Sequence, residues 1–242
     1  ADAYCGDGLT KTEFMRDDLV TLKNHMKAVV AAIGALPPPY ALEKGHWSLP
    51  ASACKGKNGF VPISVGYESE FSTTGAQNER EQQQRELAAA YQKKIVAAEA
   101  AGDYETMQKL VGQQQAQSMR QSMPFQQKDP VAVSISVNDT QSMTIDPDAV
   151  RRDGAGFLAL RTDGGPAHES VVFFFDRVAL KNAHQLASFD LGTDMRTPQK
   201  LGLLNIEIAL NGPTEMVERL VRQLDTEKVL SQLSEARTKG ED

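Results

Sequence analysis

The 242-residue chain has no long apolar run and no excess of basic residues. No hydrophobic stretch approaches the roughly 18 consecutive apolar residues that a membrane-spanning helix needs. The formal net charge is −6, from 26 lysines and arginines against 32 aspartates and glutamates. Nucleic-acid binding depends on a basic surface that contacts phosphates, so this balance argues against nucleic acid as a partner. The sequence therefore predicts neither a membrane-spanning segment nor a nucleic-acid partner.

The common short motifs of catalysis and cofactor binding are missing as well. The chain contains no Gly-x-Ser-x-Gly, no His-Glu-x-x-His, no phosphate-binding loop and no dinucleotide-binding fingerprint. The stretch from Ser52 to Lys55 matches the Ser-x-x-Lys string of penicillin-binding enzymes, but the companion strings of those enzymes are absent. We therefore predict no cofactor and no catalytic, cofactor-binding or metal-binding residue. The sequence favours a protein that is not an enzyme.

Cysteine is scarce, and Cys5 and Cys54 are the two that occur. The chain begins with Ala1 and not with methionine. This start is expected after removal of a signal peptide, and it is equally expected of a chain trimmed for expression. In an exported protein two cysteines most simply pair with each other, and the chain-entropy model gives such a loop closure about 4 kcal/mol. We predict a Cys5–Cys54 disulfide in a periplasmic or secreted protein. The alternative is two unrelated buried thiols in a cytosolic protein.

What is present is the composition of an ordinary globular protein, with 40% hydrophobic and 24% charged residues. A chain of this length forms one larger domain or two small ones. Three segments can be separated: an N-terminal helix, loop and first strand over residues 1–76, a helical insertion over 77–127, and a β-rich half with a C-terminal helix over 128–242. We expect them to form one composite domain.

The insertion is rich in glutamine and alanine and contains no proline before Pro124. Apolar residues at helical spacing mark two stripes, and Gly102 and Asp103 between them can end one helix and cap the next. The stripes are Leu87, Tyr91, Ile95 and Ala98, followed by Tyr104, Met107, Leu110 and Val111. The pattern predicts a long helical hairpin. Its polar runs have little core to bury, so we expect them to contact solvent or a protein partner.

Helices are also predicted near both ends of the chain. Between Thr10 and Ala35, apolar residues alternate steps of four and three, which is typical of a packed seam. The seam consists of Met15, Leu19, Leu22, Met26, Val29, Ile33 and Leu36. In the last helix the apolar face consists of Val217, Leu220, Val221 and Leu224, and Asp225 is expected to break or re-cap the helix. The first seam raises the option of a structural subunit that dimerises through it.

About six strands are predicted between these helices. Residues 60–71, 131–137 and 204–210 alternate as strands with one wet face, whereas 171–175 is apolar on both faces and is expected in the centre of the sheet. Two hairpins are predicted: 131–137 with Met143 and Ile145 through a three-residue loop, and 157–162 with 170–176. The predicted fold class is α+β: a largely antiparallel twisted sheet of about six strands, with N- and C-terminal helices packed on it and a long helical hairpin inserted.

Two functions of different classes remain. The first is an exported, non-enzymatic protein that acts by protein–protein or ligand contact, with a protein partner bound through the helical hairpin. The alternative is a metal-dependent or hydrolytic enzyme with a site assembled from loops around Asp146, Asp153, His168 and His184. These four do not stand at the helical or hairpin spacing of known ligand pairs, so the first function is preferred. The sequence indicates no oligomeric state.

Overall fold

The computed structural model describes residues 5, 8–73, 76–104, 106, 108–113, 130–162, 167–191 and 196–234, with the backbone alone for 76–84. The chain divides into two compact units. The first unit comprises residues 1–37, 42–71 and 131–242, and the second comprises residues 38–41 and 72–130. No helix within the described ranges is both long enough and apolar enough to cross a membrane.

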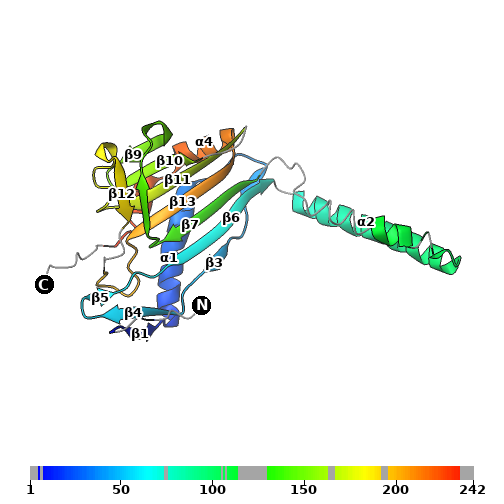
Figure 1. Cartoon of the computed structure of the whole chain (residues 1–242), viewed down its shortest axis with the longest axis horizontal. Coiled ribbons are helices and arrows are strands. Elements are labelled where there is room, and N and C mark those ends of the chain that lie inside the picture. Colours follow the sequence, from blue (N-terminus) through cyan, green and yellow to red (C-terminus); the bar gives the residue numbers. More distant parts are fainter. Residues whose placement is uncertain are drawn as a thin grey trace. The chain divides into compact units, whose positions relative to one another are not determined.

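The protein has an α+β fold with a large antiparallel sheet (Figure 1). In the described residues this sheet has eight strands, in the order β2-β6-β7-β13-β11-β10-β9, with β3 paired to β6. The strands are β2 (Tyr40–Leu42), β3 (His46–Ser48), β6 (Val65–Thr73), β7 (Val131–Val137), β9 (Val150–Gly154), β10 (Phe157–Thr162), β11 (His168–Asp176) and β13 (Asn205–Pro213). The expected number of about six strands was wrong, because short strands such as β2, β3 and β9 are too brief to show a clear alternation.

Among the described residues the first unit has three α-helices: α1 (Arg16–Ile33), α4 (Thr214–Gln223) and α5 (Thr226–Leu230). Figure 1 shows α1 running behind the main sheet. The predicted seam is confirmed in its middle, where Leu22, Met26 and Val29 are fully buried. Met15 is 70% exposed, because α1 begins only after it and strand β1 (Thr10–Glu13) precedes the helix. The buried seam is used within its own unit, so it is not available as a dimer interface.

The predicted C-terminal helix is confirmed, including its interruption. The four residues of its apolar face are buried: Val217, Leu220, Val221 and Leu224. The side chain of Asp225 accepts a hydrogen bond from the backbone N–H of Lys228 at 3.0 Å and so caps α5. Helix α4 packs on β11 and β13.

The centre of the sheet also agrees with the sequence. Strand β11 lies between β13 and β10, and Phe173, Phe174 and Phe175 are at most 2% exposed. Strands β10 and β11 form the expected antiparallel hairpin, with Phe157 opposite Phe175. An apolar run on both faces correctly predicted this central strand. Consecutive strand residues point to opposite faces, so all of them are buried only when both faces of the strand are covered.

The other predicted hairpin was wrong. Strand β7 pairs with β6 on one side and with β13 on the other, so neither of its edges is free for the segment that follows it. That segment forms β8 (Gln141–Thr144), which pairs with β12 (Ser188–Leu191) in a separate two-stranded sheet. Residues Met143 and Ile145 still bury their apolar side chains, but against a core cluster over β10 and β11 and not in the main sheet.

This core cluster covers part of the face opposite α1. Its residues are Ile145, Leu158, Leu160, Phe174, Leu180, Ala183, Phe189 and Leu191. They come from β10 and β11 below, and from β8, β12 and the short 3₁₀ helices η1 (Pro147–Ala149) and η2 (Ala183–Gln185) with their flanking residues. The rings of Phe174 and Phe189 meet with their centroids 5.0 Å apart. The first unit thus has a second layer over one half of this face.

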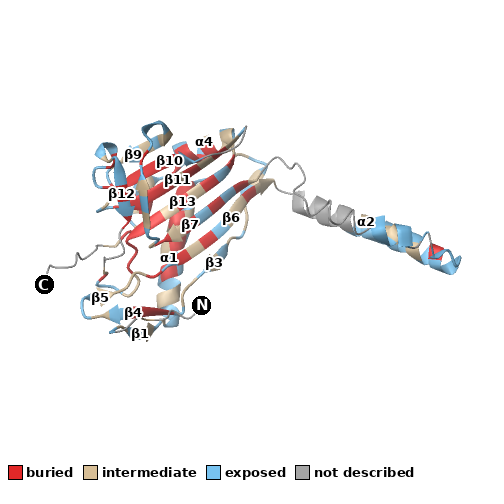
Figure 2. Ribbon diagram, in the orientation of Figure 1, coloured by how far each residue is buried: buried red, intermediate tan, exposed pale blue. Residues whose placement is uncertain are grey.

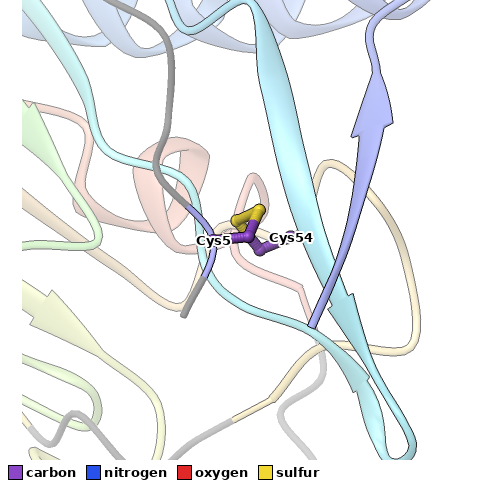
Figure 3. The surroundings of a disulfide bond; sticks show 2 residues. All are labelled: Cys5 and Cys54. Atoms are coloured by element: carbon purple, nitrogen blue, oxygen red, sulfur yellow. A yellow bond between two sulfur atoms is a disulfide. The ribbon is translucent and has the colours of Figure 1, made fainter. Parts of the chain in front are cut away.

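A small three-stranded sheet holds the disulfide. It consists of β1, β4 (Ser52–Gly56) and β5 (Gly59–Phe60) in the order β1-β4-β5. The predicted bond between Cys5 and Cys54 is confirmed, and the two Cα atoms lie 5.6 Å apart (Figure 3). Residue Cys54 is 8% exposed, so the bond ties the chain before β1 to a buried position of β4.

The long helical hairpin was wrong. The second unit contains the 25-residue helix α2 (Ala76–Ala100), and helical residues resume at Tyr104 and are described, with gaps, to residue 113. Residues 114–129, which include most of the expected second arm, lie outside the described residues. The connection between the helices agrees with the sequence. Gly102 has φ +68°, and the carboxylate of Asp103 accepts a hydrogen bond from the backbone N–H of Thr106 at 3.0 Å.

The reason for the error lies in the apolar stripes. A helical hairpin is stable only when the stripes of both arms bury each other. In the second stripe Tyr104 and Val111 are 69% and 40% exposed. In the first stripe Leu87, Tyr91 and Ile95 are only half-buried. Helical spacing alone therefore predicted the type of secondary structure but not a pair of packed arms.

Candidate binding surface

On the face of the main sheet opposite α1, the core cluster lies over β10 and β11 and includes no described residue of β6, β7 or β13. On these three strands alternate residues are exposed or half-buried, apart from the buried Asn205 at the start of β13. The residues between them are buried, apart from the half-buried Ser69 and Thr73. Figure 2 shows this alternation of exposed and buried positions along β7. We call the uncovered residues the open strip: Gly66, Glu68, Glu70, Ala132, Ser134, Ser136, Glu207, Ala209 and Asn211.

The strand register arranges the open strip in three rows. In the middle row, Glu68 lies opposite Ser134 and Ser134 lies opposite Ala209. The rows on either side are Glu70, Ala132, Asn211 and Gly66, Ser136, Glu207. The central strand β7 contributes only alanine and serine, so the middle of the strip has small side chains and the glutamates stand at its margins.

The open strip is acidic. Strands β6, β7 and β13 contain no lysine and no arginine, but they carry Glu68, Glu70 and Glu207. None of these glutamates forms an ion pair with another described residue. The strip therefore carries three carboxylates without a compensating cation.

The most buried of these carboxylates belongs to Glu207. Its Oε2 atom is buried and accepts no hydrogen bond from the described residues. Burial raises the pKa of Glu207, and the nearby carboxylate of Asp139 raises this pKa further. Both causes act against the charged form, so this margin of the strip holds negative charge at a cost in free energy.

The residues of the predicted loop site do not come together. Asp146 caps η1 by accepting from the backbone N–H of Asp148 at 3.0 Å. Asp153 is exposed on β9, His168 opens β11 opposite Pro213, and His184 is exposed in η2. Among the residues that the structure describes, no three histidine, cysteine, aspartate or glutamate side chains form a group that could hold a metal ion.

The Ser-x-x-Lys string also forms no catalytic pair. Ser52 and Lys55 lie on strand β4, where residues three apart point to opposite faces. The Ser52 side chain is buried, with 1% exposure, and Lys55 is exposed and lies over the ring of Phe60 at 5.5 Å. A lysine on the other face of the strand cannot take the proton of the serine hydroxyl.

Two further features escaped the sequence analysis. The side chain of Glu169 is 1% exposed, and its Oε1 atom lies 3.0 Å from Nη2 of Arg151. The same arginine forms an ion pair with Glu218 of α4. These charges connect β9, β11 and α4 and act as a structural tie. A shallow hollow of about 360 Å³ is lined by Ala155, Gly156, Arg177, Lys181, Glu227, Leu230 and Ser231. The hydroxyl of Ser231 in this lining donates to the backbone oxygen of Lys228 at 2.7 Å.

No protein-family model matches the chain, and no curated protein and no solved structure matches it either. The function is therefore argued from the residues of the chain itself.

Alternation in the sequence did predict a wet face on each of the three strands that form the open strip. It did not show that these wet faces adjoin, because β13 begins 68 residues after the end of β7 and β6 ends 58 residues before β7. The acidic character could have been read from the glutamates once the strand order was known.

Proposed function

We propose that the protein is an exported, non-catalytic binding protein that holds a basic surface of a partner protein on the open strip. The observation that carries this proposal is the open strip itself, with Glu68, Glu70 and Glu207 on adjacent strands that contain no cation. Surfaces whose only task is solubility usually intersperse charges of both signs. A strip of one sign favours a partner of the other sign, because complementary potentials guide the encounter and set the specificity.

The shape of the strip supports the same partner. The middle positions are alanine and serine, so the side chains of a partner can approach the strand backbones closely. Lysine and arginine side chains combine a long apolar stem with a charged head, and they can lie along such a floor while the head reaches a glutamate at the margin. An extended or flat basic segment of another protein fits this arrangement.

The disulfide supports an exported protein. Disulfides form and persist in oxidising compartments and are rare in the cytosol. In this protein the bond ties a buried cysteine of β4 to the chain before β1, as expected of a structural bond. Binding outside the cytosol is therefore the proposed setting.

Charge reversal tests the binding surface. The variant Glu68→Lys/Glu70→Lys changes the charge of the strip by about four units and leaves its third glutamate in place. We expect the affinity for a purified partner, isolated from the exported fraction on the wild-type protein, to fall at least about tenfold, mainly through a slower association rate. The measurement is surface plasmon resonance at two salt concentrations, since a charge-guided encounter weakens with salt.

The matched control reverses two exposed carboxylates on strands of the covered half, Asp153→Lys/Asp190→Lys. This variant has the same net charge as the first but an intact open strip, so it is expected to bind the partner as the wild type does. Equal loss in both variants, or no loss in either, would show that the open strip is not the binding surface.

A further inference from the structure

One corner of the first unit collects buried oxygen atoms that accept no hydrogen bond. Among the described residues six buried side-chain oxygens lack such a partner, and three of them belong to Gln141, Asn205 and Glu207. Leaving a buried acceptor without a donor costs free energy, so such atoms are uncommon in folded proteins. Two of the three lie on β13, and the third follows two residues after Asp139, whose backbone oxygen Asn205 contacts.

Strand β13 and the turn after β7 form the corner. Asn205 and Glu207 are two residues apart on β13, so their side chains lie on the same face of the strand. Asn205 is 5% exposed, and its Nδ2 donates to the backbone oxygen of Asp139 at 3.0 Å. The amide of Asn205 is thereby oriented, and its Oδ1 atom is the end that remains without a donor.

Two more side chains from the turn complete the corner. The carboxylate of Asp139 is close enough to Glu207 to act on its pKa. Gln141 follows two residues later, on the same side of β8 as Met143, which packs on the core cluster over the sheet. The amide oxygen of Gln141 is therefore on the side of β8 that faces the sheet.

The turn is held in place without any ligand. The Nδ2 atom of Asn138 donates to the backbone oxygens of Ile63 and Gly202 at 2.7 and 2.9 Å, and its Oδ1 accepts from the N–H of Leu204 at 2.7 Å. Asn138 has φ +56°, a conformation that asparagine tolerates better than most residues. The corner is thus preorganised, which lowers the entropic cost of binding.

We propose that this corner is a calcium-binding site whose protein ligands are Asp139, Gln141, Asn205 and Glu207. Two carboxylates and two amide oxygens form an all-oxygen set, which hard cations prefer over the nitrogen and sulfur ligands of zinc or copper. Calcium accepts six to eight oxygens in flexible geometry, and water can supply the remainder because Asp139 is exposed. Magnesium requires a near-ideal octahedron and suits such a corner less well.

The site differs from a cluster of acidic residues. No three histidine, cysteine, aspartate or glutamate side chains form a metal-binding group among the described residues, and the proposed ligand set has two carboxylates. The carboxylate of Asp176, opposite Asn205 on β11, already accepts two backbone hydrogen bonds. Its distinguishing feature is the pair of amide oxygens left without a donor. A cation satisfies these oxygens and reduces the repulsion between Asp139 and Glu207 at the same time.

The test is titration of the full-length protein with calcium chloride, after treatment with a chelator and its removal. Isothermal titration calorimetry should give about one calcium per chain, with a dissociation constant between about 10 µM and 1 mM, and magnesium should bind more weakly. Calcium should also raise the melting temperature of the protein, because a ligand that binds only the folded state stabilises it.

Two conservative variants decide the assignment. Glu207→Gln and Asp139→Asn keep the shape of each side chain but remove a charge, and each should weaken calcium binding at least about tenfold. Glu207→Gln should melt no lower than the wild type without calcium, since it removes a partly buried charge, and it should lose the rise in melting temperature with calcium. Unchanged stability without calcium, combined with no rise in melting temperature with calcium, distinguishes a calcium ligand from a residue that only supports the fold.

The control is Asp153→Asn, an exposed carboxylate on β9 outside the open strip, which should bind calcium as the wild type does. The site is refuted if calcium gives no saturable heat below about 10 mM, or if Glu207→Gln binds it as tightly as the wild type. Loss of partner binding in the charge-reversed Glu68 and Glu70 variant is a separate outcome, because neither residue is a proposed calcium ligand.

Discussion

The two halves of one face of the main sheet differ in what lies above them. Over β10 and β11 the outward side chains are apolar, among them Leu158, Leu160 and Phe174, and β8 and β12 cover them. Over β6, β7 and β13 the outward side chains are mostly small or acidic, and none of them belongs to this cluster. On the opposite face both halves are apolar. The comparison teaches that the second layer follows the residue types at alternate strand positions and ends where these become polar.

The carboxyl groups of the two halves show the same contrast. Asp176, at the end of β11, is 3% exposed and accepts hydrogen bonds from the backbone N–H groups of Val178 and Ala179, both at 2.8 Å. Burial raises the pKa of Asp176, although these two hydrogen bonds counteract the rise. In the open half the pKa of Glu207 is raised by burial as well, but its Oε2 accepts no hydrogen bond from the described residues. Asp176 is thus satisfied by two backbone donors, whereas the buried oxygen of Glu207 has no donor among the described residues.

The contrast between the halves is tested most strongly by truncating one outward residue in each. Phe174→Ala removes a ring that is 2% exposed and packs on Phe189, and the cavity should lower the free energy of unfolding by about 3–5 kcal/mol. Ser136→Ala in the open half should change it by less than about 0.5 kcal/mol. Urea denaturation followed by circular dichroism measures both. Similar losses at the two positions would mean that the open half is covered in solution.

The disulfide lies outside both halves, so breaking it should lower stability and leave the contrast intact. The variant Cys5→Ser/Cys54→Ser should lose about 2–4 kcal/mol of unfolding free energy, because the reduced chain has a less constrained unfolded state. The same denaturation experiment, with and without a reductant, measures this. The wild type should match the variant once reduced, and the variant should not respond to the reductant. A response of the variant would point to another cause of the loss.

A change at the start of α1, in the layer behind the sheet, should have the smallest effect and depend on pH. The hydrogen bond from Lys200, at 2.6 Å, and then that from the backbone N–H of Met15 lower the pKa of Asp18. A lowered pKa in the folded state stabilises the protein above the unfolded pKa of about 3.8, and this contribution is lost as the pH falls through the folded value. Asp18→Asn should therefore be less stable than the wild type at neutral pH.

The difference between Asp18→Asn and the wild type should shrink as the pH falls below the unfolded pKa of Asp18. Thermal melts across the acidic range measure it. Asp17→Asn is the matched control, because Asp17 is the exposed neighbour in the same first turn of α1. It should show a smaller difference. A loss for Asp18→Asn that stays constant down to the lowest pH would show that its charge is not the cause.

Much of the local structure could be predicted from the sequence, for reasons that each element shows. The four apolar residues of α4 stand at helical spacing, and all are buried. The apolar run at 171–175 has no wet face and occupies the centre of the sheet. The partner of Cys54 followed from the count, since two cysteines allow one bond. Each of these inferences uses a signal contained within a few neighbouring residues or within the composition.

The candidate site was beyond the sequence because its parts are far apart along the chain. Glu68 and Ala209 stand in one row of the open strip, although 141 positions separate them. Asn205 was predicted only as a strand residue, and nothing in its neighbourhood shows that its amide meets Asp139. The predicted loop site failed for the converse reason. Asp146 and His184 were grouped by residue type, and the fold gives each a separate place.

Side-chain periodicity by itself determined where the longer helices and strands form and which of their faces are apolar, since both depend on residues a few positions apart. Only the tertiary structure decided that β8 leaves the main sheet, that the helix after Gly102 does not form a long hairpin with α2, and that three acidic strand faces adjoin. These outcomes depend on which edges and apolar faces are already occupied by distant parts of the chain. That competition for burial and backbone pairing takes place in space, and no local pattern records it.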